Sequence, residues 1–382
     1  MKMFCRKGSR SFPISMFVIW MIILFLRPMS EAIADLETGI RAYAFGDHET
    51  ALHEFHVEAE QGNAEAQSFL GDMYRKGEGT PQNNHEAGKW YRMAAEQGEI
   101  EAQFNLGVMY EQGEGVSQDY QQAAKWFHQA ADQEYLHAQY SLGWLHVNGH
   151  GVTQDPQQAV KWFRKAANQG HAEAQYSLGW SYANGQGVAT NLEDAILWWE
   201  RAAEQGHVIA QYALGWLYQR TDETTQDDQK AAQWFRKAAE QGHRDAQYSL
   251  GWLYANGTGL TKDEREAVKW YHLAAEQGME KAQYHLGVLY FEGKGVQQDY
   301  QEAEHWIRQA AEQGNAEGQY LLGKMYRDGL GLNQDDVEAY KWFTLSADQS
   351  DGEATRARDH LATRMDITQI AEAEQRAEEW RE

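Results

Sequence analysis

Residues 246–278 read AQYSLGWLYANGTGLTKDEREAVKWYHLAAEQG and contain one complete unit of a repeated pattern. Leu250 and Leu253 fall at helical spacing on one face, which predicts a first helix in this stretch. Gly257-Thr258-Gly259 follows that helix, and glycine readily adopts the backbone conformations at which helices end. Asp263 is a good N-cap for a second helix, so the stretch predicts a helical hairpin.

The pattern recurs at a fixed interval of 36 residues along most of the chain. Its Leu-Gly pairs begin at Leu70, Leu106, Leu142, Leu178, Leu214, Leu250, Leu286 and Leu322. A tryptophan keeps the same interval at Trp90, Trp126, Trp162, Trp198, Trp234, Trp270, Trp306 and Trp342. A single supersecondary unit repeated at this period is typical of a solenoid, in which each unit buries its apolar face against its neighbours. The predicted fold class is therefore an all-α solenoid of helix-turn-helix hairpins.

Each hairpin is expected to combine large and small side chains in its core. Gly251 follows Leu250 and leaves room where a neighbouring helix must approach. The second helix is expected to bury Trp270 together with Ala274 and Ala275, and every equivalent of Ala275 is alanine. We interpret the tryptophans as knobs that fill the space beside the small alanines.

The composition excludes several classes of protein. The formal net charge is -23 at pH 7, so most of the surface would repel a polyphosphate, and nucleic acid is not an expected partner. Cys5 is the one cysteine, which rules out an intrachain disulfide and a thiolate metal site. An aromatic content of 13% is far too high for a disordered chain.

The N-terminus has the organisation of an export signal. Basic residues precede an apolar run from Phe12 to Leu26, and small residues follow it. Ala32-Ile33-Ala34 fits a cleavage site before Asp35, and Ser30-Glu31-Ala32 is a second option. The alternative is an uncleaved anchor, and both place the remainder outside the cytoplasm because the basic flank stays inside. We expect a periplasmic or secreted protein, or one anchored in the inner membrane.

The repeated residues resemble the Sel-one-like repeat (SLR) family, a relative of the tetratricopeptide repeat (TPR). The likeness lies in Ala246 to Tyr254, Gly257 and Gly259, Ala267, Trp270-Tyr271, and Ala274 to Gly278. It implies a right-handed superhelix that acts as an adaptor, often in the bacterial envelope. A cysteine-rich branch of the family, linked to penicillin binding, has a disulfide in every repeat. The repeats here contain no cysteine, so that activity is not expected.

Four segments are predicted along the chain. Residues 1–34 form a signal peptide or an N-terminal membrane anchor, and residues 35–62 form an opening TPR-like hairpin. Residues 63–349 contain the eight 36-residue Sel-one-like repeats, and residues 350–382 form the C-terminal capping helices.

An aromatic pair on the first helix of the repeat is the strongest candidate for a binding site. Tyr248 and Trp252 are four residues apart and lie on the face opposite Leu250 and Leu253, a face that lines the concave groove in TPR-like stacks. The same pair occurs as Tyr140 and Trp144, Tyr176 and Trp180, and Tyr212 and Trp216. Such side chains dominate binding energy at interfaces, so these eight are the predicted partner-binding residues. The alternative is that the rings pack between adjacent first helices.

Two other patterns are interpreted as structural. The Gly-x-Gly loops follow a helix, whereas a dinucleotide-binding fingerprint follows a strand. His171, His207 and His243 lie one repeat apart, roughly 10 Å at helix-packing distances. Zinc ligands lie about 2.0–2.1 Å from the ion, so these histidines are too far apart to share one. No catalytic constellation stands out, and we expect no metal, no cofactor and no enzymatic activity.

The expected function is that of a non-enzymatic scaffold or adaptor of the cell envelope, which binds a peptide or protein partner in the concave groove. Carbohydrate binding in polysaccharide assembly is the alternative, because Tyr and Trp faces also stack on sugars. A hydrolase is the third and least favoured hypothesis. Membrane contact is expected only through an uncleaved N-terminal anchor.

Overall fold

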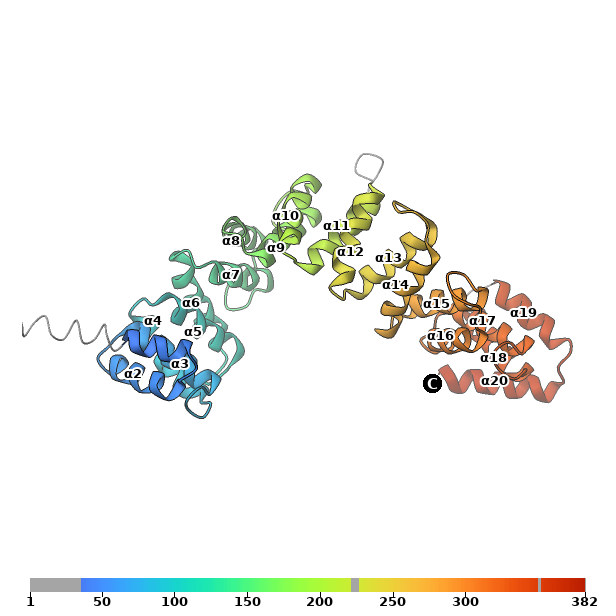
Figure 1. Cartoon of the computed structure of the whole chain (residues 1–382), viewed down its shortest axis with the longest axis horizontal. Coiled ribbons are helices and arrows are strands. Elements are labelled where there is room, and N and C mark those ends of the chain that lie inside the picture. Colours follow the sequence, from blue (N-terminus) through green and yellow to red (C-terminus); the bar gives the residue numbers. More distant parts are fainter. Residues whose placement is uncertain (1–35, 221–226, 350–351, 382) are drawn as a thin grey trace, which may run out of the picture. The chain divides into compact units, whose positions relative to one another are not determined.

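The computed structural model describes residues 36–220, 227–349 and 352–381. The predicted export segment, residues 1–34, lies outside the described residues. The chain divides into two compact units, Met1–Asn191 and Leu192–Glu382, called unit 1 and unit 2. Every regular element in the described residues is an α-helix (Figure 1), which confirms the predicted all-α fold class.

Unit 1 opens with the helical residues 36–44 and continues as a run of 13-residue helices. They are α2 (His48–Glu60), α3 (Ala64–Lys76), α4 (Asn84–Glu96), α5 (Ile100–Gln112), α6 (Tyr120–Asp132), α7 (Leu136–Asn148), α8 (Pro156–Asn168) and α9 (Ala172–Asn184). From α3 onwards, odd-numbered helices are the first helices of the repeats and even-numbered helices are the second.

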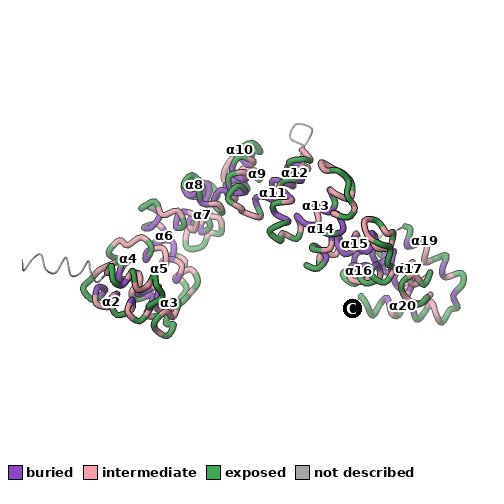
Figure 2. The backbone as a smooth tube through the Cα atoms, viewed as in Figure 1, coloured by how far each residue is buried: buried purple, intermediate pink, exposed green. Residues whose placement is uncertain are grey.

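Unit 2 continues the same alternation and ends in two closing helices. Its helices are α10 (Leu192–Glu204), α11 (Val208–Arg220), α12 (Asp228–Glu240), α13 (Arg244–Asn256), α14 (Glu264–Glu276), α15 (Glu280–Glu292), α16 (Tyr300–Glu312), α17 (Ala316–Asp328), α18 (Asp336–Asp348), α19 (Gly352–Ala362) and α20 (Ile367–Arg381). Phe343 of α18 shares a buried cluster with Leu361 of α19 and Ala373 of α20, so the closing helices cover the last repeat. Buried and exposed residues alternate along the helices of both units (Figure 2).

The helix ends follow from the residues that the sequence places there. Gly149 ends α7 in the left-handed conformation, with φ 71°, and its N–H donates to the carbonyl of Leu145 at 2.8 Å. The Asp155 carboxylate then accepts hydrogen bonds from the backbone N–H groups of Gln157 and Gln158 and so caps α8. Equivalent caps recur through both units, which explains why the helices α2 to α18 all have 13 residues.

In seven of the repeats the glycine of the Leu-Gly pair lies under a large side chain of the second helix of its own repeat. A Cβ atom added to Gly143 would lie 2.4 Å from the ring of Phe163, so no other residue fits there without a shift. The same relation joins Gly71 and Tyr91, Gly107 and Phe127, Gly215 and Phe235, Gly251 and Tyr271, Gly287 and Ile307, and Gly323 and Phe343. The central knob of the hairpin is therefore the residue after the tryptophan, and the prediction that gave this role to the tryptophan is corrected.

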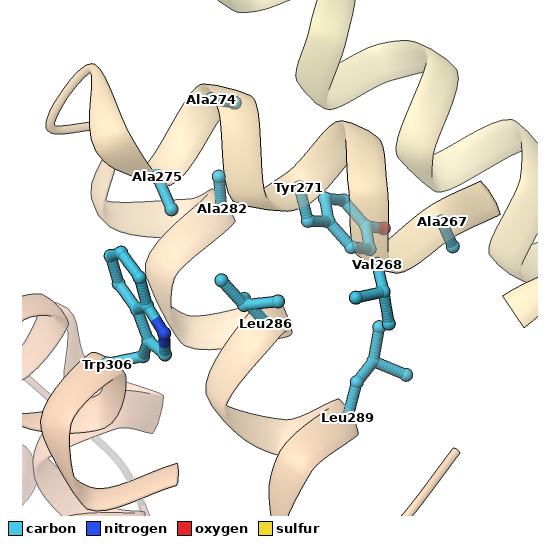
Figure 3. Close-up of a cluster of buried hydrophobic side chains, with 9 residues drawn as sticks. All are labelled: Ala267, Val268, Tyr271, Ala274, Ala275, Ala282, Leu286, Leu289 and Trp306. Atoms are coloured by element: carbon cyan, nitrogen blue, oxygen red, sulfur yellow. The ribbon is translucent and has the colours of Figure 1, made fainter. Parts of the chain in front are cut away.

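The tryptophans pack between successive repeats instead. Trp306 of α16 shares a buried cluster with Ala274 and Ala275 of α14 and with Leu286 of α15 (Figure 3). Trp126 packs in the equivalent way against the second helix of the preceding repeat in unit 1. The predicted pairing of a large tryptophan with small alanines is confirmed, but it crosses from one repeat to the next.

The second glycine of each Gly-x-Gly loop also makes a contact between repeats. Gly151 has φ 68°, and a Cβ atom there would lie 2.1 Å from the carbonyl oxygen of Tyr120, at the start of α6. In the next loop, Gly187 meets the carbonyl oxygen of Pro156 in the same way. These glycines allow the loop of one repeat to approach the second helix of the repeat before it.

A row of buried glutamines connects the helix ends, and the sequence reasoning gave it no role. Gln103 Nε2 donates to the carbonyl of Ala95 at 3.2 Å, and Gln133 Nε2 donates to Gln103 Oε1 at 2.9 Å. The first of these bonds joins two repeats and the second closes the hairpin. Equivalent buried side chains are Gln67, Gln139, Gln247, Gln283 and Gln319. The signal was the 36-residue spacing of the Ala-Gln pairs.

Candidate functional site

The tryptophans of the predicted binding residues are exposed at the surface of their units. Trp144 and Trp180 in unit 1 are 41% and 45% exposed, and Trp216 and Trp252 in unit 2 are 44% and 36% exposed. They contrast with the tryptophans of the second helices, of which Trp342 is 2% exposed. The first-helix tryptophans therefore offer indole surface to a ligand.

The tyrosines of the same pairs are packed between helices. The ring centroid of Tyr140 lies 5.8 Å from that of Phe163 and stacks at 4.7 Å on His171, the N-cap of α9. The same arrangement places Tyr212 beside Phe235 and His243. Burial raises the pKa of the Tyr140 hydroxyl above its ordinary value. Each of the two alternatives therefore describes one member of the pair: the tyrosines pack between helices, and the tryptophans are exposed at the surface.

An uncharged pocket of about 330 Å³ lies between α7 and α9 in unit 1. Trp144 of α7 and Trp180 of α9 line it, together with Phe163 of the intervening α8. Ser177 and Ser181 contribute from the α9 side. None of the residues that line this pocket carries a formal charge, so it suits an apolar or weakly polar group.

An acidic pocket of about 690 Å³ lies along α3 and the start of α5 in the same unit. Glu65 and Asp72 line it from α3, and Glu99 and Glu101 line it from the start of α5. Burial, with the neighbouring carboxylates, raises the pKa of Glu101 above its ordinary value. No lysine or arginine is among its lining residues, so the pocket favours a cationic group.

The three histidines on the 36-residue spacing are N-caps, a role that the sequence reasoning missed. His171 Nδ1 accepts a hydrogen bond from the backbone N–H of Ala174 at 3.2 Å, and His207 and His243 cap α11 and α13 in the same way. A lone pair on Nδ1 is required for this bond, so the capping imidazole is neutral. The signal in the sequence was that Asn63 and Asn315, which are ordinary N-cap residues, occupy the same register.

Burial lowers the pKa of His171 and His243 below the ordinary 6.5. His171 Nε2 lies 3.1 Å from His137 Nδ1, and His171 Nδ1 lies 3.2 Å from a carboxylate oxygen of Glu173. Protonation of Nδ1 would favour the Glu173 carboxylate and would break the cap to the backbone. His243 faces Asp245 and Arg244, whose opposed effects on its pKa are smaller than that of burial.

Acid is therefore expected to destabilise this part of the array. Because the folded-state pKa values lie below 6.5, the unfolded chain binds more protons. The histidine contribution to stability is present above about pH 6.5 and is lost as the pH falls from there through the lowered folded-state pKa values. A variant with Asn at positions 171, 207 and 243 should lose less of its melting temperature between pH 7.5 and pH 5.5. Thermal melts by circular dichroism at both pH values measure this, and equal losses in the two proteins would contradict it.

The described residues form stacked helical hairpins with exposed indoles and two surface pockets, and they define an α-helical repeat scaffold. The Sel1 repeat model matches the chain in eight consecutive segments, so the protein belongs to the Sel1 repeat family, as the resemblance indicated. The segments are residues 64–99, 100–135, 136–171, 172–207, 208–243, 244–279, 280–315 and 316–351. Repeat proteins of this kind generally mediate protein–protein interactions.

Two solved structures are similar to this chain over most of its length. One is a protective antigen present in uropathogenic Escherichia coli strains that displays an SLR fold, with 31% identity and a TM-score of 0.58 over 92% of this chain and 84% of that chain. The other is a Sel1 repeat protein from Oxalobacter formigenes, with 34% identity and a TM-score of 0.60 over 81% of this chain and 89% of that chain. No curated protein matches the sequence.

Among the described residues, no helix is both long enough and apolar enough to cross a membrane. Within the same part of the chain, no group of three or more His, Cys, Asp or Glu side chains is arranged to hold a metal ion.

Proposed function

We propose that this protein is a non-enzymatic adaptor of the cell envelope that binds a protein partner through the exposed tryptophans of its first helices. The observation that carries the proposal is the exposure of Trp144, Trp180, Trp216 and Trp252, in contrast to the half-buried tyrosine beside each of them. Exposed aromatic patches usually mark interaction sites, and tryptophan is among the residues that contribute most at interfaces.

The location in the envelope rests on the N-terminal pattern of basic, apolar and small residues. Sel1 repeat proteins of this type are often extracytoplasmic. The charge of -23 favours a neutral or basic partner over an acidic one. A partner of either kind would meet the uncharged pocket and the acidic pocket of unit 1.

Replacing Trp144 and Trp180 together with alanine is expected to abolish partner capture and to leave the fold intact. The two side chains lie at the surface and are 41% and 45% exposed, so each should change the free energy of unfolding by less than the ~3–5 kcal/mol that a fully buried aromatic residue costs. Crosslinking in intact cells, affinity purification and mass spectrometry measure capture, and thermal melts measure the fold. The same double substitution at Trp216 and Trp252 tests unit 2.

Phe45→Ala is the matched control, because Phe45 is an exposed aromatic residue that lies outside the first-helix rows. This variant should capture the same proteins as the unmodified chain. The proposal is wrong if both tryptophan double variants fold and still capture those proteins. Glycans in place of proteins among the captured material would instead support the carbohydrate alternative.

A further inference from the structure

One position in the array breaks the repeat inside the hydrophobic core. The residue three after each Leu-Gly leucine is a buried leucine or methionine in seven repeats: Met73, Met109, Leu145, Leu217, Leu253, Leu289 and Met325. In the fourth repeat this residue is Ser181, which is also buried. Ser181 Oγ donates a hydrogen bond to the carbonyl of Ser177 at 2.9 Å, so the hydroxyl is satisfied inside its own helix.

The preceding repeat shows what the serine removes. There Leu145 shares a buried cluster with Ala123 and Phe127 of α6. The residues 36 positions further on are Ala159 and Phe163 of α8, and both line the uncharged pocket together with the serine. The pocket therefore includes the space that a leucine fills one repeat earlier.

The residues that line the pocket favour an aliphatic group over a charged one. The walls of the pocket around Ser181 are the rings of Phe163, Tyr176 and the two exposed tryptophans, Trp144 and Trp180. An apolar wall without a neighbour loses its dispersion contacts, and an aliphatic side chain would restore them. A charged group would be desolvated there without a charged partner, because every lining residue is neutral.

The acidic pocket of the same unit indicates what accompanies that side chain. It lies along α3 and α5, whereas the uncharged pocket lies along α7 and α9, so the two are two repeats apart. At helix-packing distances of 8–10 Å this separation is about 20 Å. An extended chain covers it with about six residues. Glu99 and Glu101, with the carboxylates of α3, would pair with a basic side chain at that position.

We propose that the pocket at Ser181 binds a leucine or methionine side chain of an extended protein segment, which also carries a basic residue about six positions away. The partner thus supplies in trans the aliphatic group that this repeat lacks. The inference rests on the proposed function, because it names the chemistry that one part of the adaptor recognises.

The full-length protein can be tested on immobilised dodecapeptides. The probe is a Gly/Ser sequence with one Leu and a Lys-Lys pair centred six residues from it. Met in place of Leu should bind comparably, and Ala or Asp should bind at least about tenfold more weakly, the factor expected for an aliphatic side chain that loses its burial. Glu-Glu in place of Lys-Lys should also reduce binding, and added salt should weaken the Lys-Lys probe. Equal binding of the Leu and Asp peptides would overturn the proposal.

Ser181→Leu is the decisive variant, because it fills the pocket from within. It should raise the melting temperature and abolish the preference for Leu over Ala peptides. Ser249→Leu is the matched control: Ser249 lies on a first helix of unit 2 in a register that Phe69 and Leu321 also occupy, so it should leave peptide binding unchanged. A lower melting temperature for Ser181→Leu would show that the pocket is not the missing leucine site, and unchanged peptide preference would also overturn the proposal.

The adaptor function and the binding of an aliphatic side chain at Ser181 can fail separately. If Ser181→Leu captures the cellular partner normally while the Trp144→Ala/Trp180→Ala variant does not, the adaptor function stands and the pocket inference is wrong. If both variants capture it normally, the pocket inference fails and the role of the unit 1 tryptophans fails with it. Binding of oligosaccharides that competes with the Leu peptide would assign the pocket to sugars instead.

Discussion

Phe127→Ala is expected to destabilise unit 1 by about 3–5 kcal/mol, the range measured when large buried aromatic residues are truncated. Phe127 has no exposed surface, and its ring lies directly over Gly107 of the same repeat. Alanine would leave a cavity between α5 and α6 that the glycine cannot fill. Denaturant titration followed by circular dichroism measures the loss, which should appear as early unfolding of the first part of the array.

Phe45→Ala provides the control for the same chemical change. Phe45 is 89% exposed, so its truncation should alter the free energy of unfolding by no more than about 0.5 kcal/mol. Similar small losses at Phe45 and Phe127 would show that the ring over Gly107 is not a core knob.

Gly151→Ala should cost about 2–5 kcal/mol, which is the second-largest effect that the structure indicates. Its φ of 68° is in the left-handed region, where a side chain costs roughly 1–2 kcal/mol. The new Cβ would also lie 2.1 Å from the carbonyl oxygen of Tyr120, and overpacking of this kind typically costs about 1–3 kcal/mol. The backbone of one repeat would have to move away from the next.

Gly170→Ala separates the two causes. Gly170 has φ 96° and has no heavy atom within 4 Å of an added Cβ, so only the backbone term applies. The difference between the two variants, measured by denaturant titration, is the contribution of the contact between repeats. If Gly170→Ala is as damaging as Gly151→Ala, the close approach to Tyr120 contributes nothing to stability.

The hairpins and their order follow from the sequence because the 36-residue period repeats every cap, glycine and apolar position together. The sequence did not predict which side chain is the central knob of the hairpin, and Phe163 shows the reason. The tryptophan before it is invariant and conspicuous, whereas the knob position accepts Phe, Tyr and Ile over the glycine. The contact between this side chain and the glycine is a feature of the three-dimensional packing. A comparison of residue identities from repeat to repeat does not reveal it.

The candidate site was only partly predictable for a similar reason. Helical spacing places Tyr140 and Trp144 on one face, but it does not predict which side chains of the next repeat pack against that face. His171 covers the tyrosine because it is the N-cap of the following first helix, and its reach ends before the tryptophan. The pocket at Ser181 also required the structure, because a single serine in a core row becomes a cavity only when its neighbours do not close over it.

The buried glutamines have a consequence for how arrays of this kind change length. The partners of Gln103 are Ala95 and Gln133, which are 8 and 30 residues away, so each bond lies within one period or reaches only the adjoining one. Loss or duplication of a whole 36-residue segment by recombination would therefore recreate the same junction at the new joint. An in-frame change of any other length would leave buried amides without partners, which costs about 1–3 kcal/mol for each group. The buried glutamine side chains thus favour changes in array length by whole 36-residue repeats and disfavour insertions or deletions of other lengths.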